Sequence, residues 1–393
     1  MRNFLGLGAK NRLPELDGLR GLAILLVLSL HYLTYGYNNV QFGKLYRFVQ
    51  IFRLGWSGVD LFFVLSGFLI GGILLDARES PNYFKAFYVR RIHRILPVYY
   101  TWIALFAIVG SIVAERGFAK ESSVPLISVP VVVYYLFLQN LVFTPLSRFT
   151  TWWMSQTWSL AVEEQFYLVS PFLIRFLSRR RLTRVLAGCI IGAPILRAIV
   201  YSAKPGILSP QYVLMPCRAD ALAMGMLLAI AWRSDVKAWT AGHMQLANAA
   251  LAVLVAGALA MTKWMPGPRN RFEAAYQYSW LAAMYAVMIM VALLKRDGTV
   301  AKVARWPFLR EWGRISYCVY LIHTGVLWTC HRVLLHSLPR ITEWRGVATT
   351  ALALALTAGI AQISWKYFEK PLIDRGHAAR FVPSEADALA SPG

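Results

Sequence analysis

Long apolar runs separated by short basic stretches repeat along most of this 393-residue chain. Runs of about 20 apolar residues can cross a bilayer as helices, and the alternating pattern of membrane β-strands is absent from them. The pattern therefore predicts an all-α fold, a polytopic membrane helix bundle with ten spans. These spans cover residues 20–37, 56–76, 95–114, 157–177, 185–203, 216–232, 242–262, 276–294, 315–335 and 347–367.

One further apolar run, residues 124–143, is placed by the distribution of positive charge. Lys and Arg accumulate in the cytoplasmic loops of membrane proteins. If 124–143 crossed, the basic loop from Arg175 to Arg184 would be translocated; if it does not cross, most of the 41 Lys and Arg residues stay inside. We therefore predict ten spans with both termini cytoplasmic, in the inner membrane, and an interfacial or re-entrant segment at 124–143.

Composition supports a membrane protein and argues against other classes. Only 15% of the residues are charged and 58% are hydrophobic, whereas soluble domains carry about 25% charged residues. The net charge of +22 lies mostly in loops between apolar runs, where it sets topology and contacts membrane lipids; no nucleic-acid motif accompanies it. We expect one membrane-embedded domain over residues 1–377 and a disordered, polar tail over 378–393.

The four cysteines indicate neither a metal site nor a disulfide framework. They lie in or beside apolar runs and form no C-x-x-C pair, so they are expected to be small buried hydrophobic residues. No metal is expected in this protein.

Ionisable residues lie inside several of the predicted spans. His31 follows Arg20 by eleven residues, which places the imidazole about 16 Å deeper along a helix. Asp60, Glu163 and Glu164 lie at a similar predicted depth in two other spans. Buried charges are costly, so these groups are candidates for catalysis and are expected to converge on a polar cavity that opens outward. Adjacent helical residues point about 100° apart, so which glutamate faces the site is left open.

Two more spans carry polar residues with two alternative interpretations. Arg218 and Asp220 lie near the outer edge of the sixth span, where they either bind substrate or form a structural ion pair at the rim. Tyr320 and His323 share one helical face with Ser316. That face either lines a substrate pocket or joins neighbouring helices.

Arginines gather at the inner boundary of the membrane. Arg91 and Arg94 are three residues apart on a predicted helix and can present two guanidinium groups to one anion. Arg20 begins its span at the same boundary. These arginines either follow the positive-inside rule alone or bind a phosphate-rich ligand.

Together, these segments resemble the acyltransferase family 3 membrane proteins. The matching pieces occur in family order over nearly the whole chain: PELDGLRG and Arg20 to His31, GVDLFFVLSGFLI at 58–70, FYVRRIHRILPVYY at 87–100, TWSLAVEEQFYLVSPF at 157–172, RADALAMGMLLA at 218–229, ISYCVYLIH at 315–323 and YFEKPLI at 367–373. The resemblance implies ten spans and transfer of an acyl group, usually acetyl from acetyl-CoA, to hydroxyls of envelope polysaccharides, peptidoglycan, Nod factors or some macrolide antibiotics. It assigns His31 as the essential histidine, Arg20 as its basic partner, and Arg91 and Arg94 to donor binding.

A mechanism follows from these assignments. A neutral imidazole with a pKa of about 6.5 suits a general base. His31 would therefore deprotonate the hydroxyl of a glycan or lipid-linked sugar. Asp60 or a glutamate would orient the ring. Direct transfer and an acetyl-histidine intermediate both stay open, as do acyl chain length, the acceptor and a homo-oligomeric state. The alternatives are a macrolide or small-molecule O-acyltransferase, a proton-coupled transporter of a sugar or lipid intermediate, and a structural subunit of an envelope synthesis complex.

Overall fold

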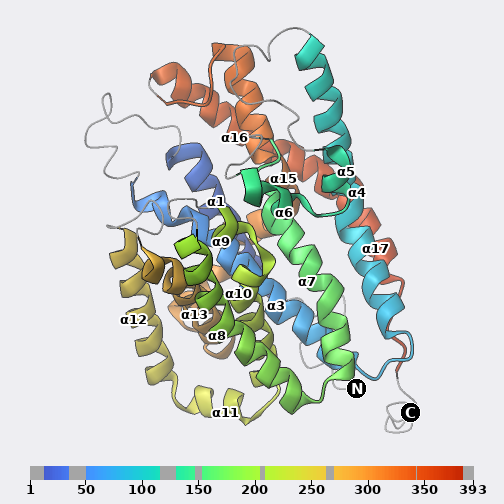
Figure 1. The fold of residues 1–393 in the computed structure, drawn as a ribbon, viewed down its shortest axis with the longest axis vertical. Helices are drawn as coiled ribbons and strands as arrows, with labels where there is room; N and C mark the ends of the chain where they lie inside the picture. Colours follow the sequence, from blue (N-terminus) through green and yellow to red (C-terminus); the bar gives the residue numbers. More distant parts are fainter. Residues whose placement is uncertain are drawn as a thin grey trace.

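The computed structural model describes residues 13–34, 50–115, 130–146, 153–203, 209–262, 270–341 and 343–383, and every regular element in these ranges is a helix (Figure 1). The longer helices are α1 (Pro14–Ser29), α3 (Gly58–Asp76), α4 (Tyr83–Glu115), α7 (Thr157–Phe176), α8 (Arg179–Ala203), α10 (Met215–Ala231), α12 (Met244–Thr262), α13 (Arg271–Leu294), α15 (Pro307–Leu335) and α16 (Trp344–Ser364). The shorter ones are η1 (Leu30–Thr34), η2 (Gln50–Ser57), α5 (Val131–Tyr135), α6 (Gln139–Leu146), α9 (Ser209–Val213), α11 (Asp235–Gly242), α14 (Thr299–Ala304), η3 (Trp365–Glu369) and α17 (Lys370–His377).

The predicted polytopic helix bundle is confirmed. Within the described ranges, nine helical stretches are long and apolar enough to cross a membrane. They correspond to every longer helix except α7, in which the run Glu163, Glu164 and Gln165 lowers the hydropathy of an otherwise apolar 20-residue helix. The protein is therefore a multi-pass membrane protein. Helix α7 corresponds to the one remaining predicted span, residues 157–177.

The two described ends of the chain bear on whether α7 crosses. Leu13, at the start of α1, and Phe381, beyond α17, line the same cavity. Both described ends also lie beside the start of α4, because Arg20 of α1 interacts electrostatically with Arg94 and Arg90 donates to the carbonyl of Ala379. They therefore lie at the same end of the bundle, which requires an even number of crossings. Nine crossings would separate them, whereas α7 as a tenth crossing brings them together.

The apolar run at 124–143 is only partly described, because residues 124–129 lie outside the described ranges. The rest forms α5 and α6, which have 5 and 8 residues, too few to cross a membrane at about 1.5 Å per residue. Tyr99 and Tyr100 of α4 donate hydrogen bonds to the carbonyls of Tyr134 and Tyr135, at 3.0 and 3.2 Å. This part of the run packs beside α4 without crossing.

Glycines let two pairs of helices approach closely. On α1, a Cβ at Gly21 would collide with the carbonyl of Leu309 of α15, and on α15 a Cβ at Gly313 would collide with the carbonyl of Asp17. Gly67 of α3 and Gly225 of α10 make the same kind of approach to each other's helix. Small residues are the usual means of close helix packing in membranes, where no hydrophobic effect drives helices together. The first of these pairs carries the candidate site.

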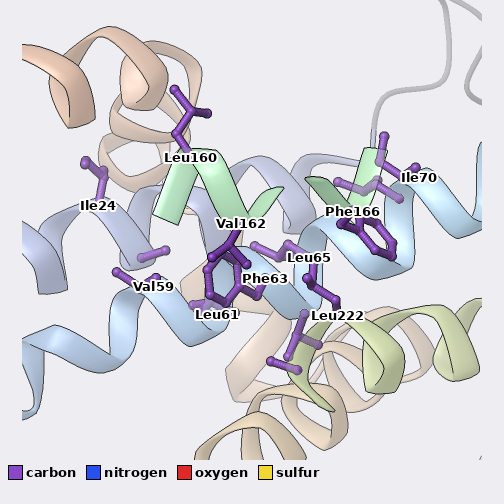
Figure 2. Packing of buried hydrophobic residues seen from close by; sticks show 14 of the residues in the cluster. Ile24, Val59, Leu61, Phe63, Leu65, Ile70, Leu160, Val162, Phe166 and Leu222 are labelled. Atoms are coloured by element: carbon purple, nitrogen blue, oxygen red, sulfur yellow. The ribbon is translucent and has the colours of Figure 1, made fainter. Parts of the chain in front are cut away.

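Helix α3 lies at the centre of the apolar packing. Figure 2 shows Leu61 and Phe63 of α3 beside Val162 of α7, with Leu222 of α10 close to Leu65. Leu61 and Val162 are fully buried. The segment rich in Phe and Leu that the sequence placed in the second span is thus buried on most sides, so its polar residues must find partners inside the protein.

Residues 378–383, the first part of the tail predicted to be disordered, contact the start of α4. Asn82 donates a hydrogen bond to the carbonyl of Arg380 at 2.7 Å, and its side-chain oxygen accepts one from the backbone of Val382 at 2.9 Å. Arg90 donates to the carbonyl of Ala379 at 2.8 Å. These six residues are therefore fastened to the start of α4, while the rest of the predicted tail, 384–393, lies outside the described residues.

Candidate active site

Two histidines meet where α1 ends. His31 lies in η1, a π-helical turn that continues α1, and His323 lies on α15. Their ring centroids are 4.9 Å apart with the planes at 70°. His323 is fully buried and His31 is half-buried. π-helical turns occur often at functional sites, and the close packing of α1 on α15 brings these two rings together.

Backbone carbonyls indicate which nitrogens of the two rings carry protons. His31 Nδ1 lies 2.9 Å from the carbonyl of Val27, and His323 Nδ1 lies 2.8 Å from that of Tyr320. A carbonyl only accepts, so both Nδ1 atoms donate. His323 Nε2 then holds a lone pair 3.4 Å from His31 Nδ1. In this arrangement His31 Nε2 also keeps its lone pair, as a general base requires.

A cavity of about 820 Å³ leads toward this pair. Its walls include the apolar side chains of Leu16, Val59, Phe62, Ile70 and Leu160. Arg20, Arg91 and Arg94 line it, and so does Tyr320. The ring of Tyr320 lies 5.9 Å from that of His323. One apolar-walled space thus extends from an arginine cluster to the neighbourhood of the histidines.

This cavity lies elsewhere than the predicted one. The sequence indicated a polar cavity that opens outward, whereas the arginines that the sequence placed at the inner boundary line this one. The convergence of acidic groups on His31 suggested an outer opening, but Asp60 pairs with Arg218 and Glu163 accepts from Ser66 and Tyr167. Five arginines line this cavity: Arg20, Arg90, Arg91, Arg94 and Arg380.

The three arginines predicted from the sequence do lie together. Arg20 is 3.5 Å from Asp17. The guanidinium of Arg91 lies over the rings of Tyr167 and Phe87, at 5.6 and 5.9 Å from the centroids. Among the described residues no carboxylate lies within salt-bridge distance of Arg91 or Arg94. Two half-buried cations are thus available for an anion.

The two adjacent glutamates differ in position. Glu163 lines the cavity and accepts hydrogen bonds from Ser66 and Tyr167. Glu164 is not among the cavity residues, and its Oε1 is buried without a hydrogen-bond partner among the described residues. Glu163 is therefore the member of the pair that faces the site. Its described contacts do not include His31, so they lend no support to the predicted ring-orienting role.

Of the two alternatives for Arg218 and Asp220, the ion pair with each other is wrong, although both form ion pairs. Arg218 instead lies 2.5 Å from Asp60, with its guanidinium 4.3 Å from the Tyr278 ring centroid. Asp220 accepts from Arg197 at 2.9 Å and from Ser279 at 2.5 Å. Arg218 and Asp220 are two positions apart on α10 and so face different neighbours. A span-internal arginine, Arg197, is the partner that the sequence did not indicate.

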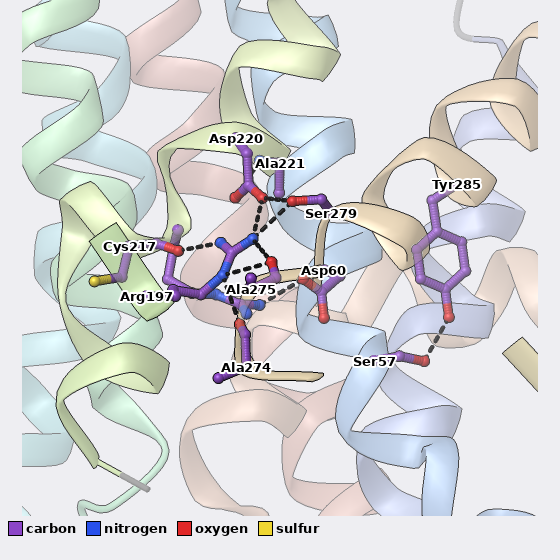
Figure 3. A network of polar contacts seen from close by, with 11 residues as sticks. Ser57, Asp60, Arg197, Cys217, Asp220, Ala221, Ala274, Ala275, Ser279 and Tyr285 are labelled. Carbon is purple, nitrogen blue, oxygen red and sulfur yellow. Dashed lines mark hydrogen bonds and ion pairs between the residues drawn. The ribbon is translucent and has the colours of Figure 1, made fainter. Parts of the chain in front are cut away.

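These two ion pairs lie inside the bundle of α3, α8, α10 and α13 (Figure 3). All four side chains are at most 1% exposed, and none lines the cavity. Arg197 also donates to the carbonyls of Cys217, Ala274 and Ala275. Such contacts satisfy buried charges and join helices. Asp60 and Arg218 thus join α3 to α10, and Asp220 joins α10 to α8 and α13. This is not the placement expected of catalytic or substrate-binding groups.

Several residues of the cavity were not predicted. Arg90, His377, Arg380 and Phe381 line it near the arginine cluster, and Ser159 accepts or donates at 2.5 Å to the hydroxyl of Tyr320. Tyr167 was detectable, because it follows Glu163 by four residues on one helix face. His377, Arg380 and Phe381 come from the last described part of the chain, whose approach to α4 has no signal in the apolar pattern.

Comparison with known proteins gives a consistent result. Residues 13–364 match the acyltransferase domain of acyltransferase family 3. The chain is similar to a peptidoglycan O-acetyltransferase of Listeria monocytogenes (28% identity over 94% of this chain and 57% of the relative) and to a putative one of Bacillus subtilis (28%, 93% and 55%). A putative O-acetyltransferase of Staphylococcus aureus is 25% identical, over 93% of this chain and 58% of the relative. The chain thus spans little more than half the length of these relatives. No solved structure matches it.

Proposed function

Because the chain belongs to acyltransferase family 3, we propose that it transfers an acetyl group from acetyl-CoA to a hydroxyl of an envelope glycan or a lipid-linked sugar. The observation that carries this proposal is the single cavity that connects the arginine cluster with the surroundings of the histidine pair. The names of the relatives support an O-acetyltransferase with a glycan acceptor.

The arginine cluster suits the phosphates of a CoA donor. Arg91 and Arg94 lie on one face of α4, and Arg20 faces the same cavity from α1. Guanidinium groups bind phosphates through paired, charge-assisted hydrogen bonds. Arg20 and His31 are separated by about 16 Å along their helix, a distance that the extended pantetheine arm of CoA covers. A donor with its phosphates at Arg20 would therefore present its thioester near His31.

His31 is proposed as the general base. Its Nε2 lone pair takes the proton of the acceptor hydroxyl while the oxygen attacks the thioester carbonyl. The carbon–sulfur bond breaks as the new ester bond forms, and His31 returns the proton to the departing thiolate. The charge that develops on the imidazolium is stabilised at Nδ1 by the Val27 carbonyl and by His323 Nε2.

The arginine end of the cavity is proposed to face the cytoplasm. The positive-inside rule places the basic loops there, and CoA is available on that side. The acceptor then reaches His31 from the other side of the inner membrane. This arrangement explains why the donor-binding groups and the base lie at different depths.

Purified protein in proteoliposomes, supplied with acetyl-labelled acetyl-CoA, provides the test. We expect label to appear on a hydroxyl of one member of an acceptor panel that includes lipid-linked glycans, peptidoglycan fragments and macrolides. Transfer to a macrolide alone would replace the glycan by a small-molecule acceptor. Absence of both transfer and thioester hydrolysis, together with acceptor-driven proton uptake into the liposomes, would favour a transporter and contradict the proposal.

A further inference from the structure

The last described residues of the chain form part of the cavity wall. His377 ends α17, and Arg380 and Phe381 follow it; all three line the cavity. They lie beyond residue 364, where the match to the family ends. Asn82 holds this segment through two hydrogen bonds and Arg90 through a third. Its place in the wall is thus fixed by specific contacts with α4.

This wall gathers cations around an aromatic ring. The guanidinium of Arg90 lies 4.7 Å from the ring centroid of Phe381. Arg90, Arg380 and His377 all line this part of the cavity, close enough to interact electrostatically. In the described part of the chain neither Arg90 nor Arg380 has a carboxylate within salt-bridge distance. Like charges held together in this way are relieved by a bound anion.

We propose that residues 377–381 bind the adenosine phosphate end of the donor, an inference that rests on the proposed function. The phosphates nearest the pantetheine arm would occupy Arg20, Arg91 and Arg94, which leaves the nucleotide to extend toward the segment beyond α17. Arg380 supplies a cation for its phosphate, and His377 lines the same wall. Phe381 and the planar guanidinium of Arg90 supply flat surfaces on which a purine stacks.

Two ligands distinguish binding at this wall from binding in the rest of the cavity. CoA carries the adenosine phosphate end, and 4′-phosphopantetheine lacks it while keeping the arm. We expect Arg380→Ala to weaken CoA binding about tenfold, and Phe381→Ala to weaken it at least about fivefold, since each base–aromatic stack contributes on the order of that factor or more. Binding of 4′-phosphopantetheine should change less than about twofold in both variants. Isothermal titration of the purified full-length protein gives these affinities.

Arg375→Ala is the matched control. Arg375 is exposed on α17, carries the same charge and does not line the cavity, so this variant should bind CoA within about twofold of the wild type. Equal effects of Arg380→Ala and Arg375→Ala, or an equal loss for both ligands, would overturn the inference while wild-type CoA binding left the proposed donor site intact. A wild-type protein that binds no CoA would overturn the proposed function and this inference with it.

Discussion

Among its described neighbours, the proposed general base His31 has a second histidine where such a base usually has a carboxylate. In a hydrolase triad a carboxylate holds the imidazole and stabilises its charged form. Here the described neighbours of His31 Nδ1 are the carbonyl of Val27 and the neutral ring of His323. Asp60 and Glu163, which the sequence suggested for this task, are bonded to Arg218, Ser66 and Tyr167. A neutral acceptor avoids placing an extra charge at depth in the membrane.

His323 should therefore act through His31. His323→Leu removes the Nε2 acceptor at similar size, and we expect kcat to fall by about 10- to 100-fold, a part of the 10²–10⁴ that a general base contributes. The KM for acetyl-CoA should stay within about twofold. His323→Gln offers a side-chain oxygen in place of Nε2 and should recover most of the lost rate. Steady-state kinetics decide; equal losses in both variants would indicate that the ring serves packing alone.

Asp220 should matter for folding and not for transfer. Asp220→Ala leaves Arg197 buried without its carboxylate, and we expect stability to fall by about 3 kcal/mol. The rate per folded molecule should remain near the wild-type rate, because Asp220 does not line the cavity. Thermal unfolding in detergent and activity normalised to folded protein separate the two effects. A large loss of rate at unchanged stability would restore the substrate-binding role that the sequence suggested.

Among the elements, the contact between α1 and α15 sets the geometry of the site. Gly21 and Gly313 remove side-chain bulk from this contact, and the π-helical turn η1 then carries His31 toward His323. The sequence showed both helices as apolar spans. It did not show that they are neighbours, since the two glycines that let their backbones approach lie far apart in the sequence.

Separation of these two helices should impair catalysis. Gly21→Ala places a methyl group against the carbonyl of Leu309, and overpacking of this kind costs about 1–3 kcal/mol. We expect a lower unfolding temperature and a reduced kcat as His31 moves away from His323. Gly192→Ala on α8 is the control, because nothing lies within 4 Å of the added methyl. It should be neutral or slightly stabilising, and a loss there as large as at Gly21 would refute the role of close packing.

For the whole molecule, hydropathy and charge predicted most of the architecture. The helices appear where the apolar runs are, because a spanning segment must satisfy its own backbone hydrogen bonds. Partners inside the bundle were harder to predict. Arg20, Arg91 and Arg94 share a predicted depth and do meet, whereas Arg218 and Asp220 share a helix end and do not pair. Depth follows from sequence position, but the direction in which a side chain faces depends on which helices become neighbours.

The orientation of the site in the membrane depends on whether α7 crosses. In a protein without native cysteines, single cysteines at Ser178, after α7, and at Leu338, between α15 and α16, report on the two sides. Both positions are exposed. We expect an impermeant maleimide to label Leu338→Cys in intact cells and Ser178→Cys only after permeabilisation. Lys85→Cys, exposed at the start of α4, is the reference on the other side of α7 in the sequence. Labelling of Ser178→Cys in intact cells while Lys85→Cys is labelled only after permeabilisation would mean that α7 does not cross.

The central claim is that one cavity binds the donor at its arginine end and delivers the acetyl group to His31. CoA affinity and acetyl transfer, measured on the same preparations of wild type, His31→Ala and an Arg91→Ala, Arg94→Ala double variant, test it most directly. We expect His31→Ala to bind CoA as the wild type does and to lose transfer at least about 100-fold. The double variant should lose CoA affinity by at least about tenfold, since two charge-assisted contacts are removed. Transfer that persists in His31→Ala, or unchanged affinity in the double variant, would contradict the account.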